Sequence, residues 1–380
     1  MYSISAELKE KYVRLLEKLC LMETPSGNKK NIDLMVDVIE NFAIDSGFAT
    51  ERFPFERAGD FLLIKLNPER EEKPVLLMAH MDTVHKVGAF GEPAVTIDGD
   101  VMHGPGVMDC KGGVVTGLCI LEVLKYSGRP INLLLTSDEE VNGLLSGEKG
   151  YEIIMNMAGE SAAVFNLEPG KPGEVTVGRK GILHMSVSVT GVSAHAGNAY
   201  FSGASAIKEA AHAILEIEAM SEKDGITFNC GTVNGGTVSN TVPDYCEIAV
   251  DIRVSTMEEM QRAEDAMRAV CRHSVIENTK RSVSVVSRRP PMELAENNMR
   301  LFDIWNASAR ALGMAEFKAI KRGGGSDAAY ATLVGVPTLC SCAMEGWGEH
   351  TLNETADLST FADRVSLISE TIGYIFKNNI

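Results

Sequence analysis

Three short apolar segments of the sequence each run directly into histidine or carboxylate side chains. The segments and the polar residues that follow them are 75–79 with His80 and Asp82, 131–136 with Glu139 and Glu140, and 162–167 with Glu168. Continuous apolar runs of this length are typical of strands that are buried on both faces of a sheet. In open α/β sheets, ligands bind outside the carboxyl ends of the strands, so we expect these side chains to converge on one site.

Two loops supply further candidate side chains. Asp109 lies in the glycine-rich segment 104–113, where glycine lets the backbone approach a ligand closely before a helix begins. Much later in the chain, His350 lies on a second loop, just after Gly346 and Gly348. The two loops add one more carboxylate and one more imidazole to the candidate residues.

This collection of carboxylates and imidazoles predicts a site for divalent cations. Several carboxylates in one place repel one another unless cations neutralise their charge. Imidazole and carboxylate ligands suit zinc, with manganese or cobalt as alternatives. A bridging carboxylate with two further ligands for each ion would make a two-metal site, which polarises a carbonyl group and activates water near neutral pH.

The adjacent residues Glu139 and Glu140 suit a division of labour. Neighbouring side chains on an extended chain point to opposite sides. One of the two can then bind metal, while the other takes a proton from the attacking water and passes it to the leaving amine. Each residue also has a structural alternative, since the pair could begin a solvated helix. The combination at successive strand ends favours the functional interpretation.

The order of helical and strand-like segments predicts two domains. Helices alternate with buried strands through residues 1–174, which is typical of an α/β sheet covered by helices. Within residues 175–289 the order becomes β-α-β-β-α-β, which suits a small α+β domain with one exposed sheet face. Helical segments in residues 290–380 complete the first domain. We therefore expect a discontinuous domain, 1–174 and 290–380, into which a second domain, 175–289, is inserted.

The composition of the chain excludes several classes of partner. The formal net charge of −16 over 380 residues argues against nucleic acid and against anionic membranes. No apolar run approaches the roughly 20 residues that a membrane-spanning helix needs. Segment 1–21 reads as a helix of the domain and not as a signal peptide, and the eight cysteines form no C-x-x-C pair. We therefore expect a cytoplasmic protein with buried, reduced thiols.

Seven motifs run along nearly the whole chain. They are the segments 80–84, 106–113, 136–140, 167–169, 193–197 and 323–329, and the single residue His350. In type and order they resemble the motifs of the dinuclear zinc exopeptidases, the group of glutamate carboxypeptidase, peptidase T and aminoacylase (peptidase clan MH). The resemblance implies a mixed α/β sheet between helices, with an inserted ferredoxin-like dimerisation, or lid, domain. The residues of segment 80–84 and the triple glycine 323–325 most resemble those of glutamate carboxypeptidase.

The resemblance implies five metal ligands and two zinc ions per chain. Asp109 would bridge the two ions. His80 and Glu168 would complete the ligands of one ion, and Glu140 and His350 those of the other.

Two further residues would act beside the metal ions. Glu139 would be the general base and later the general acid. Asp82 would hydrogen-bond His80, which fixes the imidazole ring and raises its basicity.

The resemblance also gives the inserted domain a part in the site. His195 resembles the histidine that reaches the active site of a neighbouring subunit and stabilises the developing oxyanion. Asn240 and Arg253 match substrate-binding positions, where an arginine would grip a carboxylate, and Gly324 and Gly325 would line the substrate pocket. We expect a homodimer through this domain, because His195 needs a partner subunit to act. The structural alternatives are a β-bulge at His195, a surface ion pair at Arg253 and a plain turn at the glycines.

These residues lead to one main hypothesis of function and two weaker ones from other classes. The main hypothesis is a metal-dependent exopeptidase or amidohydrolase that acts on a small peptide or N-acyl amino acid with a free carboxylate, an N-acyl-amino-acid deacylase being the main enzymatic alternative. A catalytically silent relative that binds metal or peptide would have lost a ligand or the general base, yet all are present. A cation-storing acidic protein would show repeated calcium-loop spacing, which the sequence lacks.

Overall fold

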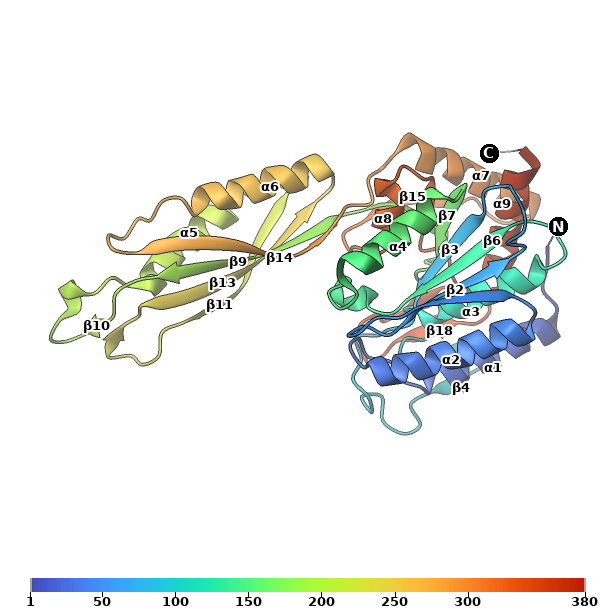
Figure 1. The fold of residues 1–380 in the computed structure, drawn as a ribbon, viewed down its shortest axis with the longest axis horizontal. Helices are drawn as coiled ribbons and strands as arrows, with labels where there is room; N and C mark the ends of the chain where they lie inside the picture. The colour runs from blue at the N-terminus through green and yellow to red at the C-terminus, as the bar shows by residue number, and fades with distance from the viewer. Residues whose placement is uncertain (1, 379–380) are drawn as a thin grey trace. The chain divides into compact units, whose positions relative to one another are not determined.

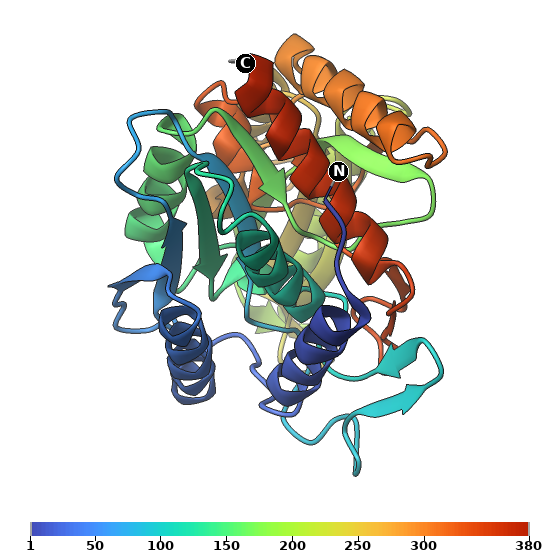
Figure 2. The same ribbon diagram turned by 90° about the vertical axis from the view of Figure 1, so that its right-hand side faces the viewer.

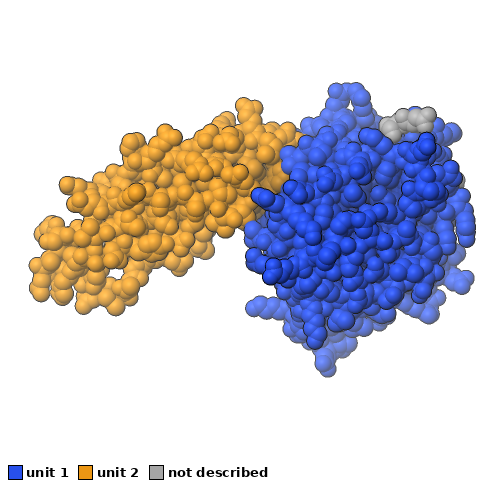
Figure 3. Space-filling view, in the orientation of Figure 1, with its two compact units in different colours: residues 1–178, 294–321, 326–380 blue, residues 179–293, 322–325 orange. Residues whose placement is uncertain are grey.

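The computed structural model describes residues 2–378, which form two compact units (Figure 3). Unit 1 comprises Met1–Gly178, Leu294–Lys321 and Ser326–Ile380, and unit 2 comprises Arg179–Glu293 and Arg322–Gly325. Met1, Asn379 and Ile380, which the sequence prediction placed in the first domain, lie outside the described residues.

Unit 1 is built on a mixed sheet. Within residues 2–378 this sheet has eight strands in the order β1-β2-β6-β3-β7-β16-β8-β15. The strands are β1 (Ala49–Phe53), β2 (Phe61–Leu66), β3 (Val75–His80), β6 (Ile131–Thr136), β7 (Ala163–Asn166), β8 (Glu174–Arg179), β15 (Lys318–Arg322) and β16 (Thr338–Cys340). Strand β3 is parallel to both of its neighbours, β6 and β7, whereas β2 is antiparallel to β6. The three strands that carry candidate residues at their ends are therefore adjacent and share one direction.

The central strands are buried on both faces because their side chains alternate between two apolar layers. In β3, Val75 and Leu77 belong to the larger hydrophobic core, and Leu76 and Met78 belong to a smaller one. Five helices contribute to the larger core: α1 (Ala6–Cys20), α2 (Lys29–Asp45), α3 (Lys111–Val123), α7 (Glu296–Ala311) and α9 (Phe361–Asn378). The smaller core is completed by α4 (Gly147–Gly159) and α8 (Ala328–Leu333). The two sets of helices cover opposite faces of the sheet (Figures 1 and 2).

A second sheet of unit 1 joins two loops that are far apart in the sequence. Its order is β17-β18-β5-β4, with strands β4 (Thr96–Asp98), β5 (Val101–His103), β17 (Gly346–Trp347) and β18 (Thr355–Asp357). Antiparallel pairing of β18 with β5 places Thr355 opposite His103. The segment between β17 and β18, which contains His350, thereby lies beside the glycine-rich segment that follows β5.

Unit 2 has an antiparallel sheet with helices on one face (Figure 1). Its strands follow the order β11-β13-β9-β14. In chain order its elements are β9 (Gly181–Thr190), α5 (Ala206–Glu218), β11 (Thr227–Gly235), β13 (Tyr245–Val254), α6 (Met257–Val270) and β14 (Lys280–Arg289). Met185 and Val187 pack into the core of this unit, whereas the alternating residues His184 and Ser186 lie on the other face. A short ladder of β10 (Ala194–His195) and β12 (Thr241–Val242) is separate from this sheet.

The predicted fold class, an α/β unit with a mixed sheet and a β-α-β-β-α-β insert, is confirmed. Some local features differ from the sequence prediction. Helices α4 and α8 were not predicted, because α4 contains three glycines and α8 is only six residues long. No helix in residues 2–378 has both the length and the apolar character that crossing a membrane requires.

The bounds of unit 2 also differ from the predicted 175–289. Strand β8 pairs with β16 in the sheet of unit 1, so unit 2 begins only at Arg179. Residues 322–325 group with unit 2, in which Arg179 and Arg253 donate hydrogen bonds to the carbonyl groups of this segment.

Candidate metal centre

The candidate ligands come from the carboxyl ends of three adjacent parallel strands and from two loops. His80 is the last residue of β3 and lies opposite Thr136, the last residue of β6. The chain after β6 leads to Glu139 and Glu140, and the chain after β7 leads to Glu168. The convergence expected from the sequence follows from this strand order, because neighbouring parallel strands end at the same edge.

Asp109 lies between two histidines and meets each with a different oxygen. Its Oδ1 is 3.0 Å from Nε2 of His80, and its Oδ2 is 3.3 Å from Nε2 of His350. The same nitrogen of His350 lies 3.1 Å from Oε2 of Glu140. A carboxylate with one oxygen directed to each of two ligand groups has the form of a bridging ligand.

Potential ligand atoms within 4.8 Å of one another form groups that share members. One group contains Asp109, Glu140 and His350, and another contains His80, Glu139 and Glu168. The acidic side chains Asp109, Glu139 and Glu168 are each about 8% exposed. Burial at this level greatly increases the cost of leaving negative charge without compensation.

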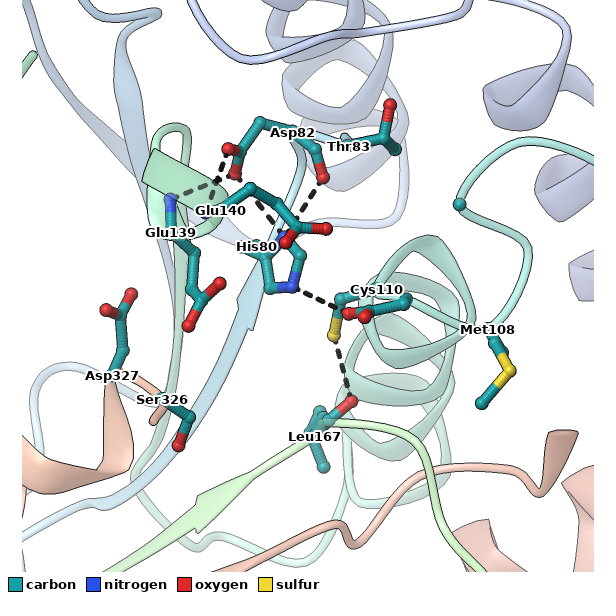
Figure 4. A network of polar contacts seen from close by, with 12 residues as sticks. His80, Asp82, Thr83, Met108, Cys110, Glu139, Glu140, Leu167, Ser326 and Asp327 are labelled. Atoms are coloured by element: carbon teal, nitrogen blue, oxygen red, sulfur yellow. Dashed lines mark hydrogen bonds and ion pairs between the residues drawn. The ribbon is translucent and has the colours of Figure 1, made fainter. Parts of the chain in front are cut away.

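Cys110 is a further neighbour of His80 and Asp109 that the sequence analysis did not consider as a ligand. Its Sγ donates a hydrogen bond to the carbonyl oxygen of Leu167 at 3.1 Å, as Figure 4 shows. Burial raises the pKa of this thiol well above its ordinary value. Because the thiolate is the form that binds metal, the protonated Cys110 is a poor ligand.

The titration of the site reflects strong coupling between its charges. Burial and the charge of Asp109 raise the pKa of Glu140 to about 7, although its hydrogen bond with His350 acts in the opposite direction. Hydrogen bonds with Asp109 and Glu140 raise the pKa of His350 to about 11. Burial alone would raise the pKa of Asp109, but its hydrogen bonds with His350 and His80 hold it below the ordinary range.

The pKa of His80 is raised, as that of His350 is. Burial would lower the pKa of its imidazole, but hydrogen bonds with Asp109 and Asp82 raise it well above the ordinary value. Protons on the two histidines take the place that a cation would occupy between imidazole and carboxylate. Metal binding releases such protons, since histidine binds a metal as the neutral imidazole.

The donor set fits a divalent metal centre. Oε1 of Glu140 is buried and has no hydrogen-bond partner within the described part of the chain. A buried oxygen of this kind is costly unless another group, such as a cation, satisfies it. Together, two imidazoles and several buried carboxylates make up the nitrogen and oxygen ligands that zinc takes.

Asp82 contacts more than the imidazole that the sequence analysis assigned to it. Nδ1 of His80 lies 3.0 Å from the main-chain oxygen of Asp82 and 3.4 Å from its carboxylate. The carboxylate also accepts hydrogen bonds from the N–H groups of Glu139 at 3.1 Å and Glu140 at 3.2 Å, and from the hydroxyl of Ser26 at 2.6 Å. Asp82 therefore orients His80 and the two glutamates at once (Figure 4).

The prediction that Glu139 and Glu140 lie on an extended chain is wrong. Residues Glu139–Val141 form a single 3₁₀ turn, η1. The side chains still diverge, because Glu139 joins the group of His80 and Glu140 joins the group of Asp109. Asp138 holds the turn from its other end by accepting hydrogen bonds from the N–H groups of residues 145 and 146.

Sequence reasoning missed two acidic residues near the site. Asp327 accepts a hydrogen bond from Oγ1 of Thr136 at 2.9 Å, which places it at the carboxyl end of β6 (Figure 4). It belongs to the motif 323–329, where only the glycines had been given a role. Glu354 is fully buried beneath the loop of Asp109. Its position shortly after His350 was the only signal that could have drawn attention to it.

The remaining predicted site residues all lie in unit 2. His195 is exposed in β10, and its Nδ1 accepts hydrogen bonds from the N–H groups of Gly197 and Asn198 at 3.1 and 3.0 Å. The proton of the neutral ring must then be on Nε2. Asn240 is exposed, and its carbonyl oxygen accepts a hydrogen bond from Ala196.

Arg253 and the glycine segment are linked to each other within unit 2. Nε and one terminal nitrogen of Arg253 bind Asp251 at 2.6 and 2.9 Å. Its Nη1 lies 3.5 Å from the carbonyl oxygen of Gly323, and Arg179 donates to the carbonyls of Gly324 and Gly325 at 3.3 Å. The carbonyl groups of the triple glycine are thus occupied by arginines.

Comparison with known proteins agrees with this architecture. Residues 177–279 match the family model of the peptidase dimerisation domain. The chain is 29% identical over 374 residues to carboxypeptidase G2 of Pseudomonas sp. (strain RS-16), and the match covers 95% of this chain and 88% of that protein.

Two solved structures share the fold. The aminopeptidase PepT of Bacillus cereus has a TM-score of 0.76 and 22% identity, over 97% of this chain and 99% of its own. YXEP of Bacillus subtilis, described as a dinuclear metal-binding peptidase, has a TM-score of 0.71 and 14% identity, over 98% and 99% of the two chains. At these identities the comparison establishes the common fold.

Proposed function

We propose that this chain, a homologue of carboxypeptidase G2 that carries a peptidase dimerisation domain, is a metal-dependent exopeptidase. It would hydrolyse the peptide or amide bond of a small substrate that has a free carboxylate, in the manner of a glutamate carboxypeptidase or a di- or tripeptidase. The observation that carries this proposal is the position of Asp109, which has one oxygen directed to His80 and the other to His350.

Five residues are proposed to hold two divalent cations, for which zinc is the first candidate. Asp109 would contact both ions, His80 and Glu168 one of them, and Glu140 and His350 the other. When bound, such cations supply a Lewis acid that polarises the scissile carbonyl group and lowers the pKa of water.

Glu139 is proposed to move the proton during hydrolysis. It lies next to a proposed ligand, in the group of His80 and Glu168, yet it is not needed to complete either set of ligands. Its carboxylate can accept the proton of the attacking water and return it to the leaving amine. The carboxylate of Asp82 accepts a hydrogen bond from the backbone N–H of Glu139, which helps to fix the position of Glu139.

Unit 2 is proposed to recognise the substrate. Nη1 of Arg253 reaches Gly323 only at 3.5 Å, the outer limit of a hydrogen bond, so we assign this atom to the substrate carboxylate. The N–H of His195 at Nε2, on an exposed ring, would donate to the developing oxyanion. Asn240 and the segment of Gly324 and Gly325 would complete the substrate contacts.

The role of His195 also requires assembly, and we propose a homodimer through the dimerisation domain, in which His195 serves the partner subunit. A size measurement that finds only monomers at the working concentration would reject this part of the proposal. We propose the cytosol as the compartment, since all eight cysteines are free thiols.

The test is a hydrolysis assay with metal-free protein to which zinc, manganese or cobalt is returned. The panel contains dipeptides, tripeptides, peptides that end in glutamate and N-acyl amino acids, each with the matched C-terminal amide as control. Metal-dependent release of the C-terminal residue, absent with the amides, would support the exopeptidase. Cleavage of the N-acyl amino acids alone would assign a deacylase instead. Metal binding without any cleavage would favour a silent relative and reject the exopeptidase.

A further inference from the structure

Glu354 is a fully buried carboxylate that touches none of the proposed reacting groups. Its Oε1 accepts hydrogen bonds from the N–H groups of Met108 and Asp109, both at 3.0 Å. Its Oε2 accepts one from the N–H of Gly106 at 3.0 Å and lies 2.9 Å from Nε2 of His85. Four hydrogen bonds therefore surround one side chain, and one of them is to the residue proposed to bridge the metal ions.

The turn that binds Glu354 has a shape that depends on this carboxylate. Backbone N–H groups of one turn that converge on one point form a site for an anion, and here the chain supplies the anion itself. Gly106 has a φ of +70°, and a Cβ at this position would lie 2.4 Å from Cγ2 of Thr83. The turn therefore packs against the strand end after His80 and has little room to shift.

Glu354 is itself held by the segment that carries His350. Its backbone N–H bonds to the carbonyl of Thr351, and its own carbonyl accepts the N–H of Gly104 at 3.3 Å. The next residue, Thr355, begins β18 and pairs with β5. The backbone of Glu354 thus belongs to the segment of His350, and its carboxylate holds the turn of Asp109.

We propose that Glu354 is a positioning residue that sets the separation of Asp109 and His350 and thereby the affinity of the centre for metal. The inference rests on the proposed function, because it assigns metal ligation to these two residues. Outer partners of metal ligands characteristically change metal affinity by about 10–100-fold when they are replaced.

The substitution Glu354→Gln changes the hydrogen bonding and leaves the shape of the side chain nearly unchanged. An amide has one acceptor oxygen and one NH₂ donor, so its donor must face one of the N–H groups that Glu354 accepts. The turn then loses an acceptor either at Gly106 or at Met108 and Asp109, and in both cases the segment that carries Asp109 is held less firmly. We expect zinc affinity to fall by about 10–100-fold.

A matched control is available in unit 2. Glu209 is also fully buried and also accepts backbone N–H groups, those of Val275 and Ile276. Glu209→Gln makes the same chemical change away from the metal ligands, so it lowers stability without lowering metal affinity. Glu354→Asp is the second variant, since it keeps the charge and withdraws the carboxylate by one methylene.

The experiment titrates zinc into the wild-type full-length chain and the three variants in competition with a chromophoric chelator. The visible spectra of the cobalt-loaded proteins are recorded alongside. Weaker zinc binding and an altered cobalt spectrum in Glu354→Gln and Glu354→Asp, with wild-type values in Glu209→Gln, would support the inference. Wild-type affinity and spectrum in both Glu354 variants would overturn it and leave the proposed function intact. Failure of the wild-type chain to bind zinc or cobalt would overturn both.

Discussion

The two units of the molecule each bury acidic side chains, but they compensate the charge in different ways. In unit 2, Glu209 accepts hydrogen bonds from Nε of Arg281 at 2.5 Å and from the N–H of Ile276 at 2.7 Å. Arg281 is itself buried and also binds Glu216 at 2.6 Å. In this unit, protein groups supply both the positive charge and the hydrogen bonds.

The acidic cluster of unit 1 lacks this internal compensation. Asp109 and Glu140 share His350, and the remaining buried oxygen of Glu140 has no partner among the described residues. Histidines must be protonated to balance the carboxylates, which appears as the raised pKa of His350. The comparison teaches that buried acids alone do not mark a metal site. The distinguishing feature of unit 1 is that protonated histidines balance these carboxylates and that one buried oxygen of Glu140 has no partner among the described residues.

The largest effect on activity should come from replacing Glu139, the carboxylate of unit 1 that is not a proposed metal ligand. Glu139→Gln should retain bound zinc and lose about 10²–10⁴-fold in turnover, because it removes the group that moves the proton. Parallel measurements of zinc content and kcat test this, with Glu148→Gln, an exposed residue in the first turn of α4, as the control. Full turnover in Glu139→Gln would exclude Glu139 as the base.

Breaking the internal compensation of unit 2 should be nearly as costly, but in stability. Arg281→Met leaves Glu209 buried without its cation, which typically costs about 3–5 kcal/mol. The measurement is urea unfolding followed by circular dichroism, with and without zinc. Zinc should not restore the stability that Arg281→Met loses. If zinc did restore it, the acidic cluster of unit 2 would not differ from that of unit 1 as described.

Metal removal should affect unit 1 alone. Both tryptophans, Trp305 and Trp347, lie in unit 1, so their fluorescence reports the unfolding of that unit. Zinc at a free concentration of 100 times its Kd should stabilise this transition by about 2.7 kcal/mol per site, and a chelator should remove the gain. A fluorescence transition that is indifferent to zinc and chelator would contradict the account of unit 1.

The smallest expected effect is the pH dependence of the unit 2 cluster. Burial would raise the pKa of Glu209, but the N–H groups of Ile276 and Val275 and the guanidinium of Arg281 lower it. The stability that the ionised group contributes is complete above the unfolded-state value of about 4.3. It is lost as the pH falls through the lower folded-state value. The difference in unfolding free energy between the wild type and Glu209→Gln should therefore shrink on acidification, and a difference that grew would contradict the assigned direction.

The sequence was informative for site residues that directly follow a buried strand. His80, Glu139, Glu140 and Glu168 could be predicted to lie together because each follows a buried strand, and parallel strands end at one edge. Glu354 could not, since its role depends on hydrogen bonds to residues 245–248 positions earlier in the chain.

Local conformation and long-range ion pairs were equally hidden. The chain after β6 forms a 3₁₀ turn, although an extended chain was expected. The carboxylates of Asp82 and Asp138 accept hydrogen bonds from backbone N–H groups in and after this turn. The partnership of Glu209 with Arg281 spans 72 positions and leaves no pattern in either helix or strand periodicity. In each case the structure depends on a side chain that binds backbone groups or charges far away in sequence.

The most direct test of the central claim is the metal content of the purified chain at equilibrium, measured for the wild type and for Asp109→Asn. After metal removal and return of zinc, the account predicts two ions per wild-type chain, as for a two-metal site with a bridging carboxylate. In Asp109→Asn, where the bridge is lost, it predicts fewer ions or much weaker binding. A wild-type chain that binds no zinc, manganese or cobalt, or an Asp109→Asn chain that binds zinc as the wild type does, would contradict it.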